Sequence, residues 1–176
     1  MKLHYLAGPM RGIKSFNYPA FDEAAAELRN LGYEIKNPTE FDSPGARYKA
    51  MQSKDGALID GEVAGKTWGE ILGRDVTILS DECEGIILLP GWEKSEGARL
   101  ECFCAIGRGY DCYCWHPEYK IIMLMSHHTL LLEMTNSLVA KEEHTWFTSV
   151  DLCTCNSDPE ITCVLHVHRE WEVDLE

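Results

Sequence analysis

Residues 89–101 combine types and spacings that could support nucleophilic chemistry. Their pattern is an apolar strand, a tight Pro-Gly loop and a helix that starts at Ser95. Backbone amides and the positive end of the helix dipole would then attract a phosphate to the Ser95 hydroxyl. Glu101 lies further into this helix, among small residues that leave room for a ligand, and the nearby helix end favours an ionised carboxylate. Such a group could attack an anomeric carbon, whereas the alternative is an ordinary solvated glutamate.

A second carboxylate, Asp75, falls on the apolar stripe of another expected helix, together with Trp68, Leu72 and Leu79. A carboxylate in that position must be paired or must have a functional reason to be desolvated. Arg74 is its neighbour in sequence but is expected to point elsewhere on the helix, so a simple ion pair does not explain the position. Asp75 is therefore a candidate acid or base, and the alternative is a carboxylate that caps a nearby loop.

The turn after the first expected strand, residues 5–12, is the third candidate. Gly8 lets backbone amides approach a ligand, Pro9 sharpens the turn, and Arg11 supplies a cationic group that can bind an anion. The alternative interpretation is a turn without a ligand.

The elements that must position these residues follow from the apolar periodicity and from the turn residues. Asn17 is expected to cap the first helix, Gly32 to end it, and Ser126 to cap the last one. Residues 37–67 show no lasting periodicity and predict a long connection with at most one helical turn. The pattern predicts strands at 2–7, 33–36, 85–89 and 120–125, and helices at 17–32, 68–79, 97–108 and 126–140.

This alternation predicts an α/β fold in three layers, with helices on both faces of a parallel sheet. Ligands in such folds bind at the carboxyl ends of the strands. We expect one α/β domain over residues 1–140 and an extension over residues 141–176, packed on that domain or on a partner subunit. Strand-like residues at 145–150 and 161–167 flank a turn and suggest a hairpin in the extension.

The extension also gathers potential metal ligands: Cys153, Cys155, Cys163, His166 and His168. Structural zinc sites usually space their cysteines by two to four residues, and a Cys-x-Cys pair does not match that spacing. Core thiols and an ordinary edge strand are the favoured interpretation, and we predict no metal site.

Composition excludes several classes of protein. The 176 residues carry a net charge of −13, and 45% are hydrophobic, which supports a folded core and disfavours binding to nucleic-acid polymers. No apolar run approaches the length of about 20 residues that a membrane span needs, and the start of the chain lacks the apolar region of a signal peptide. We therefore expect a cytoplasmic protein with reduced thiols and no membrane partner.

Several short motifs together resemble a known superfamily over about residues 3–110. They are Tyr5-x-Ala7-Gly8-Pro9-Met10-x-Gly12, Asn17, Asn37-Pro38, Arg74-Asp75 and Pro90-Gly91-Trp92-x-x-Ser95-x-Gly97-Ala98. They look like a family common in phage genomes that is similar to nucleoside 2-deoxyribosyltransferases and deoxynucleoside 5'-monophosphate N-glycosidases. The block Ser95-x-Gly97-x-x-x-Glu101 is the most specific part of the resemblance.

The resemblance implies a flavodoxin-like fold and cleavage of an N-glycosidic bond without a cofactor. It matches Glu101 to the nucleophile and Asp75 to the carboxylate that assists at the base or sugar. Serine at position 95 is typical of superfamily members that accept a 5'-phosphate, whereas an acid there would repel one. The substrate-binding residues that it implies are Tyr5, Gly8, Pro9, Met10, Arg11, Glu84, Trp92, Ser95 and Gly97.

Two features depart from the family pattern. Glu84 occupies a position where relatives usually have aspartate, and residues 111–176 match no family that we can name. In these enzymes the C-terminal part commonly completes the site of a neighbouring subunit, which implies a homodimer or higher homo-oligomer and a site residue in the extension.

The sequence therefore predicts an N-glycosidase that hydrolyses a nucleoside monophosphate to free base and (deoxy)ribose 5-phosphate, in the cytoplasm of a cell that could be an infected bacterial host. One alternative is a transferase that passes deoxyribose to a second base. The other is a phage protein that binds and sequesters a nucleotide without turnover.

Overall fold

The structure is a computed structural model, and it describes residues 2–57, 62–63 and 66–139. The chain divides after Leu138 into two units, and the second, Val139–Glu176, lies almost wholly outside the described residues. The expected hairpin at 145–150 and 161–167 and the cysteine and histidine cluster of the extension fall in that part of the chain. The first unit is Met1–Leu138.

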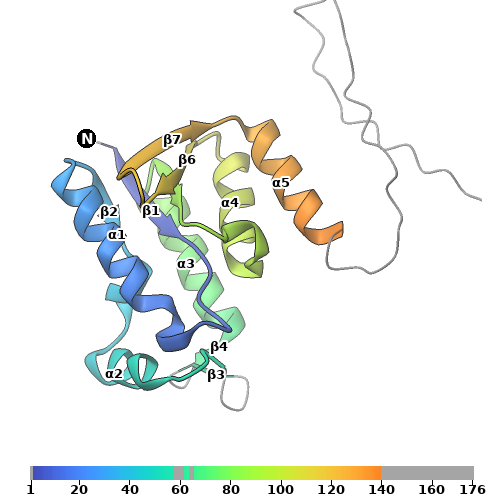
Figure 1. Cartoon of the computed structure of the whole chain (residues 1–176). Coiled ribbons are helices and arrows are strands. Elements are labelled where there is room, and N and C mark those ends of the chain that lie inside the picture. The colour runs from blue at the N-terminus through green and yellow to red at the C-terminus, as the bar shows by residue number, and fades with distance from the viewer. Residues whose placement is uncertain (1, 58–61, 64–65, 140–176) are drawn as a thin grey trace, which may run out of the picture. The chain divides into compact units, whose positions relative to one another are not determined.

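A five-stranded sheet in the order β2-β1-β5-β6-β7 forms the centre of the first unit (Figure 1). The first four strands are parallel, and β7 runs antiparallel to β6 at the edge. All four residues of β5 are buried, as expected for a strand covered on both faces. The bounds are β1 Leu3–Ala7, β2 Glu34–Lys36, β5 Gly85–Leu88, β6 Asp111–His116 and β7 Ile121–Met125.

Five α-helices accompany the sheet within the described part of the chain: α1 Tyr18–Asn30, α2 Pro44–Gln52, α3 Trp68–Glu82, α4 Glu96–Gly107 and α5 His127–Val139. Short 3-10 helices η1 Lys14–Asn17, η2 Pro38–Phe41 and η3 Trp92–Lys94 lie in the connections, and β3 Glu62–Val63 pairs with β4 Lys66–Thr67 in a separate two-stranded sheet.

Two hydrophobic clusters cover the two faces of the central sheet, one on each face. Leu6 and Ile87 point to one face and pack with Phe21 and Leu28 of α1. Tyr5 and Ile86, their neighbours along β1 and β5, point to the other face and pack with α3, α4 and α5, which contribute Leu79, Cys102 and Leu130. Alternation along β1 and β5 thus supplies both cores, and the predicted three-layer α/β architecture is confirmed.

The structure differs from the predicted elements in two places. β6 was not predicted, because its sequence Asp-Cys-Tyr-Cys-Trp-His contains no Val or Ile. As a result, the strand predicted at 120–125 is an antiparallel edge strand next to β6, not a fourth parallel one. The expected loop contains α2, whose nine residues bury only Ala50 and therefore show no apolar stripe. Ser43 at the N-cap and Pro44 at the first helical position were its sequence signals.

The helix ends match the prediction at two sites and differ at one. Gly32 follows α1 with a φ of 93°, and Ser126 accepts a hydrogen bond from the backbone N–H of Thr129 at 3.1 Å. Asn17 precedes α1 but does not cap it, because its side chain donates instead to the carbonyl oxygen of Pro9 at 2.8 Å. Asn17 therefore fixes the turn after β1.

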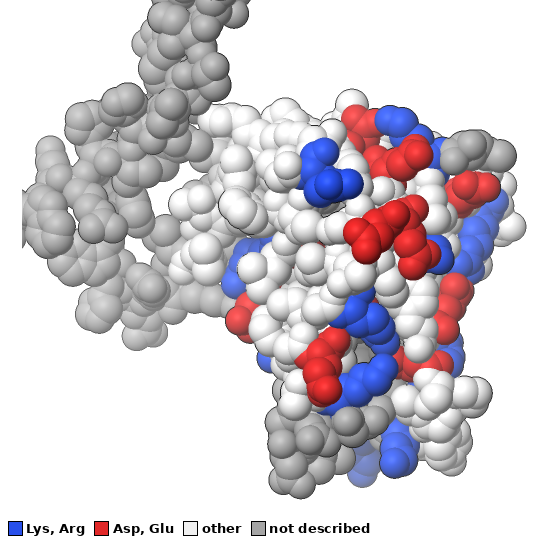
Figure 2. All heavy atoms as spheres, turned by 180° about the vertical axis from the view of Figure 1, so that it is seen from behind, with Lys and Arg blue, Asp and Glu red and all other residues white. Residues whose placement is uncertain are grey.

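Charged side chains of both signs are interspersed over one part of the face in Figure 2, beside a wide area without charge. The described residues include several exposed apolar side chains, among them Tyr119, Ile121, Met123 and Leu124 around β7. A search of the described helices found none with the length and apolar character that crossing a bilayer requires.

Candidate active site

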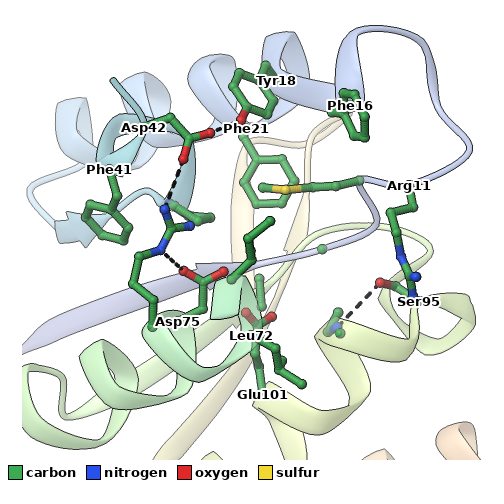
Figure 3. A pocket seen from close by; sticks show the side chains of 18 of the residues that line it. Arg11, Phe16, Tyr18, Phe21, Phe41, Asp42, Leu72, Asp75, Ser95 and Glu101 are labelled. Atoms are coloured by element: carbon green, nitrogen blue, oxygen red, sulfur yellow. Dashed lines mark hydrogen bonds and ion pairs between the residues drawn. The ribbon is translucent and has the colours of Figure 1, made fainter. Parts of the chain in front are cut away.

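A cavity of about 330 Å³ opens at the carboxyl ends of β1 and β5 (Figure 3). Its walls come from the loop after β1, the segment around η2, α3 and the first two turns of α4. This is the edge of a parallel sheet at which ligands bind in open α/β folds. The volume lies in the range of small-molecule sites.

Glu101 lines the cavity from the second turn of α4, and only 7% of it is exposed. The Tyr5 hydroxyl, on β1, donates a hydrogen bond to its Oε1 at 3.0 Å. Burial, with the nearby charge of Asp75, raises the pKa of Glu101 to about 8. The expectation that the helix end keeps this carboxylate ionised is wrong for the unliganded protein, because the dipole acts mainly on the first turn and Glu101 lies beyond it.

Asp75 lines the same cavity from α3, and it is 7% exposed. A capping box between Thr67 and Glu70 starts α3 and so fixes the phase of this helix. Burial raises the pKa of Asp75, although the hydrogen bond from Arg74 opposes that effect. The two carboxyl groups that the sequence singled out therefore face one cavity, and both hold protons more tightly than exposed carboxyl groups do.

Arg74 does not point away from Asp75, and that prediction is wrong. Its Nε donates to Asp75 Oδ1 at 2.8 Å, and its Nη1 donates to Asp42 Oδ1 at 2.9 Å. Adjacent helical residues do not share a face, but the long arginine side chain folds back over the cavity wall and reaches its neighbour. Burial disfavours the charge of Arg74, but the two carboxylates outweigh it, and the net effect raises its pKa.

The start of α4 forms another wall of the cavity. Ser95 is the N-cap, and its Oγ accepts a hydrogen bond from the backbone N–H of Ala98 at 3.4 Å. This role uses the oxygen as acceptor, so the hydroxyl hydrogen can still donate to an anion. Gly97 also lines the cavity, and a Cβ there would meet nothing within 4 Å, so the backbone is accessible. The arrangement suits an anionic ligand.

The loop after β1 lies opposite the start of α4. Gly8 lines the cavity and packs tightly, because a Cβ there would lie 2.8 Å from the Leu89 Cβ. Arg11 donates to Glu96 Oε2 at 2.7 Å, and its guanidinium lies 5.0 Å from the centre of the Trp68 ring. Arg11 thus connects this loop to both α3 and α4.

Met10 and four aromatic residues make a large apolar wall of the cavity. The aromatic side chains are Phe16, Tyr18, Phe21 and Phe41. Phe16 and both of its neighbours have left-handed backbone conformations, with φ of 56°, 49° and 60° for residues 15 to 17. Non-glycine residues rarely adopt this conformation, and such strain concentrates at functional sites. Apart from Met10, the residues of this wall were not predicted from the sequence, although the closely spaced aromatic residues at the start of α1 were a possible signal.

Four of the predicted site residues do not line the cavity. Tyr5 lies behind Glu101 and acts on it through the hydrogen bond. Pro9 accepts the Asn17 bond and therefore belongs to the turn. Trp92 is 3% exposed and packs in the core beside α4. Glu84 precedes β5, and its backbone N–H donates to the carbonyl oxygen of Leu3. It therefore lies at the amino ends of the parallel strands, whereas the cavity lies at their carboxyl ends.

Among the described residues, no group of three or more histidine, cysteine, aspartate or glutamate side chains is arranged to hold a metal ion. The five described cysteines are free thiols, and none lines the cavity. The site is therefore built from three carboxyl groups (Asp42, Asp75 and Glu101), two arginines, a helix start and an aromatic wall.

Comparison with curated proteins gave no match. A family model described as "Domain of unknown function (DUF4406)" matches residues 1–113, which include the whole of the cavity described above. That match covers more than half of the chain, and the chain therefore belongs to the DUF4406 family.

Proposed function

We propose that this protein hydrolyses the N-glycosidic bond of a deoxynucleoside 5'-monophosphate and releases the free base and deoxyribose 5-phosphate. The observation that carries the proposal is the pair of buried carboxyl groups, Glu101 and Asp75, that face one cavity. Retaining glycosidases use two such groups, one as nucleophile and one as acid. The resemblance of the sequence to deoxyribosyltransferase-like enzymes supports the same assignment.

In the proposed first step, an oxygen of ionised Glu101 attacks C1' of the sugar while the bond from C1' to the base nitrogen breaks. Asp75 donates its proton to the departing base, and a glycosyl ester of Glu101 remains. Water then attacks C1' of the ester while the bond from C1' to the Glu101 oxygen breaks; Asp75 accepts a proton from that water, and Glu101 leaves as a carboxylate. The Tyr5 hydroxyl donates to Glu101 Oε1, which orients the carboxylate for the attack.

The proposed roles require one proton on the pair of carboxyl groups. Burial raises the pKa of both groups, and the charge of Asp75 adds to the effect on Glu101, so removing the second proton from the pair is unfavourable near neutral pH. Arg74 lowers the pKa of Asp75, so in the unliganded site the single proton is held more tightly by Glu101. The proposed reactive form has that proton on Asp75, so the proton must move from Glu101 to Asp75 before the attack. That form gives an ionised nucleophile and a protonated acid at the same time.

The two ends of the cavity suit the two ends of a nucleotide. One end of the cavity would bind the 5'-phosphate. It is formed by Ser95, the accessible backbone at Gly97 and the guanidinium of Arg11. The aromatic wall would hold the flat base by stacking. The sugar then lies between them, beside Glu101 and Asp75.

The test is chromatography of ribo- and deoxynucleoside monophosphates after incubation with the wild type or with Glu101→Ala. We expect the wild type to release the base of at least one nucleotide, and the variant to be slower by about a thousand-fold or more because the nucleophile is missing. Circular dichroism and thermal melting check that the variant is folded. Equal rates for the two proteins would contradict the proposal.

Adding a second free base to the same reaction separates hydrolysis from transfer. Hydrolysis gives deoxyribose 5-phosphate whether or not the second base is present. A new nucleotide made from that base would instead identify a transferase, which uses the same glycosyl ester. Tight binding with every nucleotide recovered intact would overturn the catalytic proposal and leave nucleotide sequestration.

A further inference from the structure

Asp42 lies directly after η2 and lines the cavity, 32 residues before Arg74 in the sequence. One oxygen of its carboxylate accepts a hydrogen bond from the Tyr18 hydroxyl, and the other accepts one from Arg74 at 2.9 Å. The side chain of Asp42 is only 15% exposed, and that of Arg74 only 22% exposed. The pair is therefore largely removed from water and belongs to the wall of the site.

Arg74 is held between the carboxylates of Asp42 and Asp75, both of which are labelled in Figure 3. Its Nε bonds to Asp75 at 2.8 Å while the Phe41 ring lies 5.5 Å from the guanidinium carbon. An arginine in contact with Asp75 alone would favour ionised Asp75 and oppose its use as an acid. The negative charge of Asp42 offsets that effect, and its hydrogen bond fixes the direction of the guanidinium.

We propose that Asp42 is a positioning residue for the reaction: it holds Arg74 against Asp75 and offsets the arginine charge, so that Asp75 can keep the proton that the leaving base requires. This inference rests on the proposed function. Asp42 acts through Arg74 and needs no contact with the substrate.

The other charged and titratable groups around Asp75 are fixed by separate elements. Tyr5 approaches from β1 and Glu101 from α4, while Arg74 belongs to α3 itself. Arg11 and Lys66 also line the cavity. None of these groups changes in an Asp42→Asn variant, and asparagine has nearly the same shape as aspartate. The substitution therefore removes one negative charge and leaves the others in place.

The experiment compares the wild type with Asp42→Asn by two methods. The first is NMR titration of the side-chain carboxyl carbons of the unliganded protein, which needs no turnover. The second is the pH profile of kcat/KM for base release. Removing a negative charge makes protonation less favourable, so both apparent pKa values of the Asp75 and Glu101 pair should fall by about one unit. Both limbs of the pH profile should move by the same amount.

Glu40→Gln is the matched control. Glu40 lies two residues from Asp42 and accepts two hydrogen bonds from Arg29 at 2.7 and 2.9 Å, but it does not line the cavity. This variant also removes one negative charge and one arginine partner, and we expect its titration curves and its pH profile to match those of the wild type.

The two methods separate failure of this inference from failure of the proposed function. Unchanged titration curves in Asp42→Asn would overturn the role of Asp42, even if base release is slower. If the wild type releases no base but the titration curves shift, the proposed reaction fails while the effect of Asp42 on Asp75 stands. A shift of equal size in Glu40→Gln would also overturn the inference, because it would show that the loss of any negative charge in this region shifts the titration curves.

Discussion

The burial that raises the pKa of Glu101 would also remove water from it in its proposed role as nucleophile. A carboxylate on the protein surface is hydrated and therefore reacts poorly, whereas Glu101 is 7% exposed and has Tyr5 as its hydrogen-bond donor. The opposing carboxyl of Asp75 makes it costly to ionise both groups. In the proposed reaction Glu101 is the nucleophile and Asp75 the acid, so the proton that burial holds on Glu101 must pass to Asp75.

Ser95→Asp tests the phosphate end of the cavity at the level of one side chain. Aspartate is a good N-cap, so α4 should still form. Its charge would repel a 5'-phosphate but not a 5'-hydroxyl, and kcat/KM should fall about ten-fold more for nucleotides than for the matching nucleosides. Steady-state kinetics on both substrates measure the ratio, with Ser95→Asn as the uncharged control. Equal losses for nucleotide and nucleoside would contradict the assignment.

At the scale of elements, the sequence identified those residues whose signals are local. Ser95 and Glu101 could be found because a Pro-Gly loop and a helix start precede them, and Asp75 because it interrupts an apolar stripe. Asp42 could not be found in this way, since its partner Arg74 is 32 residues away and the segment between them shows no periodicity.

β6 was not predicted, and Glu84 was wrongly assigned to the site. In both cases the sheet, and not the local sequence, decides the position. β6 is held by its neighbours in the sheet, β5 and β7, and not by the strand propensity of its own residues. Its buried residues Cys112 and Trp115 are three positions apart and belong to different hydrophobic clusters, so the strand does not show a simple alternation. Glu84 was assigned to the site from the resemblance alone, whereas the direction of β5 places it at the amino ends of the parallel strands, opposite to the cavity.

The ion pair between Arg11 and Glu96 gives a prediction about how the loop after β1 and the start of α4 share a ligand. Both side chains are at least 40% exposed, so the pair contributes little to stability. A bound phosphate must compete with Glu96 for the guanidinium. Glu96→Gln should therefore lower KM for nucleotides about two- to five-fold, with kcat unchanged.

The corresponding control removes the cation. Arg11→Gln should raise KM for nucleotides and leave KM for nucleosides unchanged, because only the nucleotide has a phosphate for Arg11 to bind. A higher KM in Glu96→Gln would show that the ion pair organises the loop for binding and does not compete with the ligand.

At the scale of the whole molecule, the site is a source of instability that depends on pH. The pKa of Glu101 is about 8 in the folded protein against 4.5 as its ordinary value, so the unfolded chain loses this proton first as pH rises. The free energy of unfolding should therefore fall between these two pH values, by at most about 1.4 kcal/mol per pH unit from this group. Below pH 4.5 Glu101 does not change the free energy of unfolding with pH, since it is protonated in both the folded and the unfolded state.

Glu101→Gln removes this titration and should stabilise the protein increasingly from pH 5 to pH 8 relative to the wild type. Urea unfolding at several pH values measures the difference. Glu23→Gln, at an exposed position on α1, is the control and should give a constant difference. A constant difference for Glu101→Gln as well would show that Glu101 is already ionised in the folded protein.

The most direct test of the central claim is to trap the glycosyl ester on Glu101. A 2'-fluoroarabinonucleoside 5'-monophosphate slows the hydrolysis of such an intermediate, because the fluorine destabilises the positive charge that develops on the sugar in the transition state. Intact-protein mass spectrometry of the wild type should show a gain of one fluorinated sugar phosphate, and peptide mapping should place it on Glu101. The Glu101→Gln protein should gain nothing. Release of base without an adduct on Glu101, or the same adduct in both proteins, would contradict a glutamate nucleophile at this position.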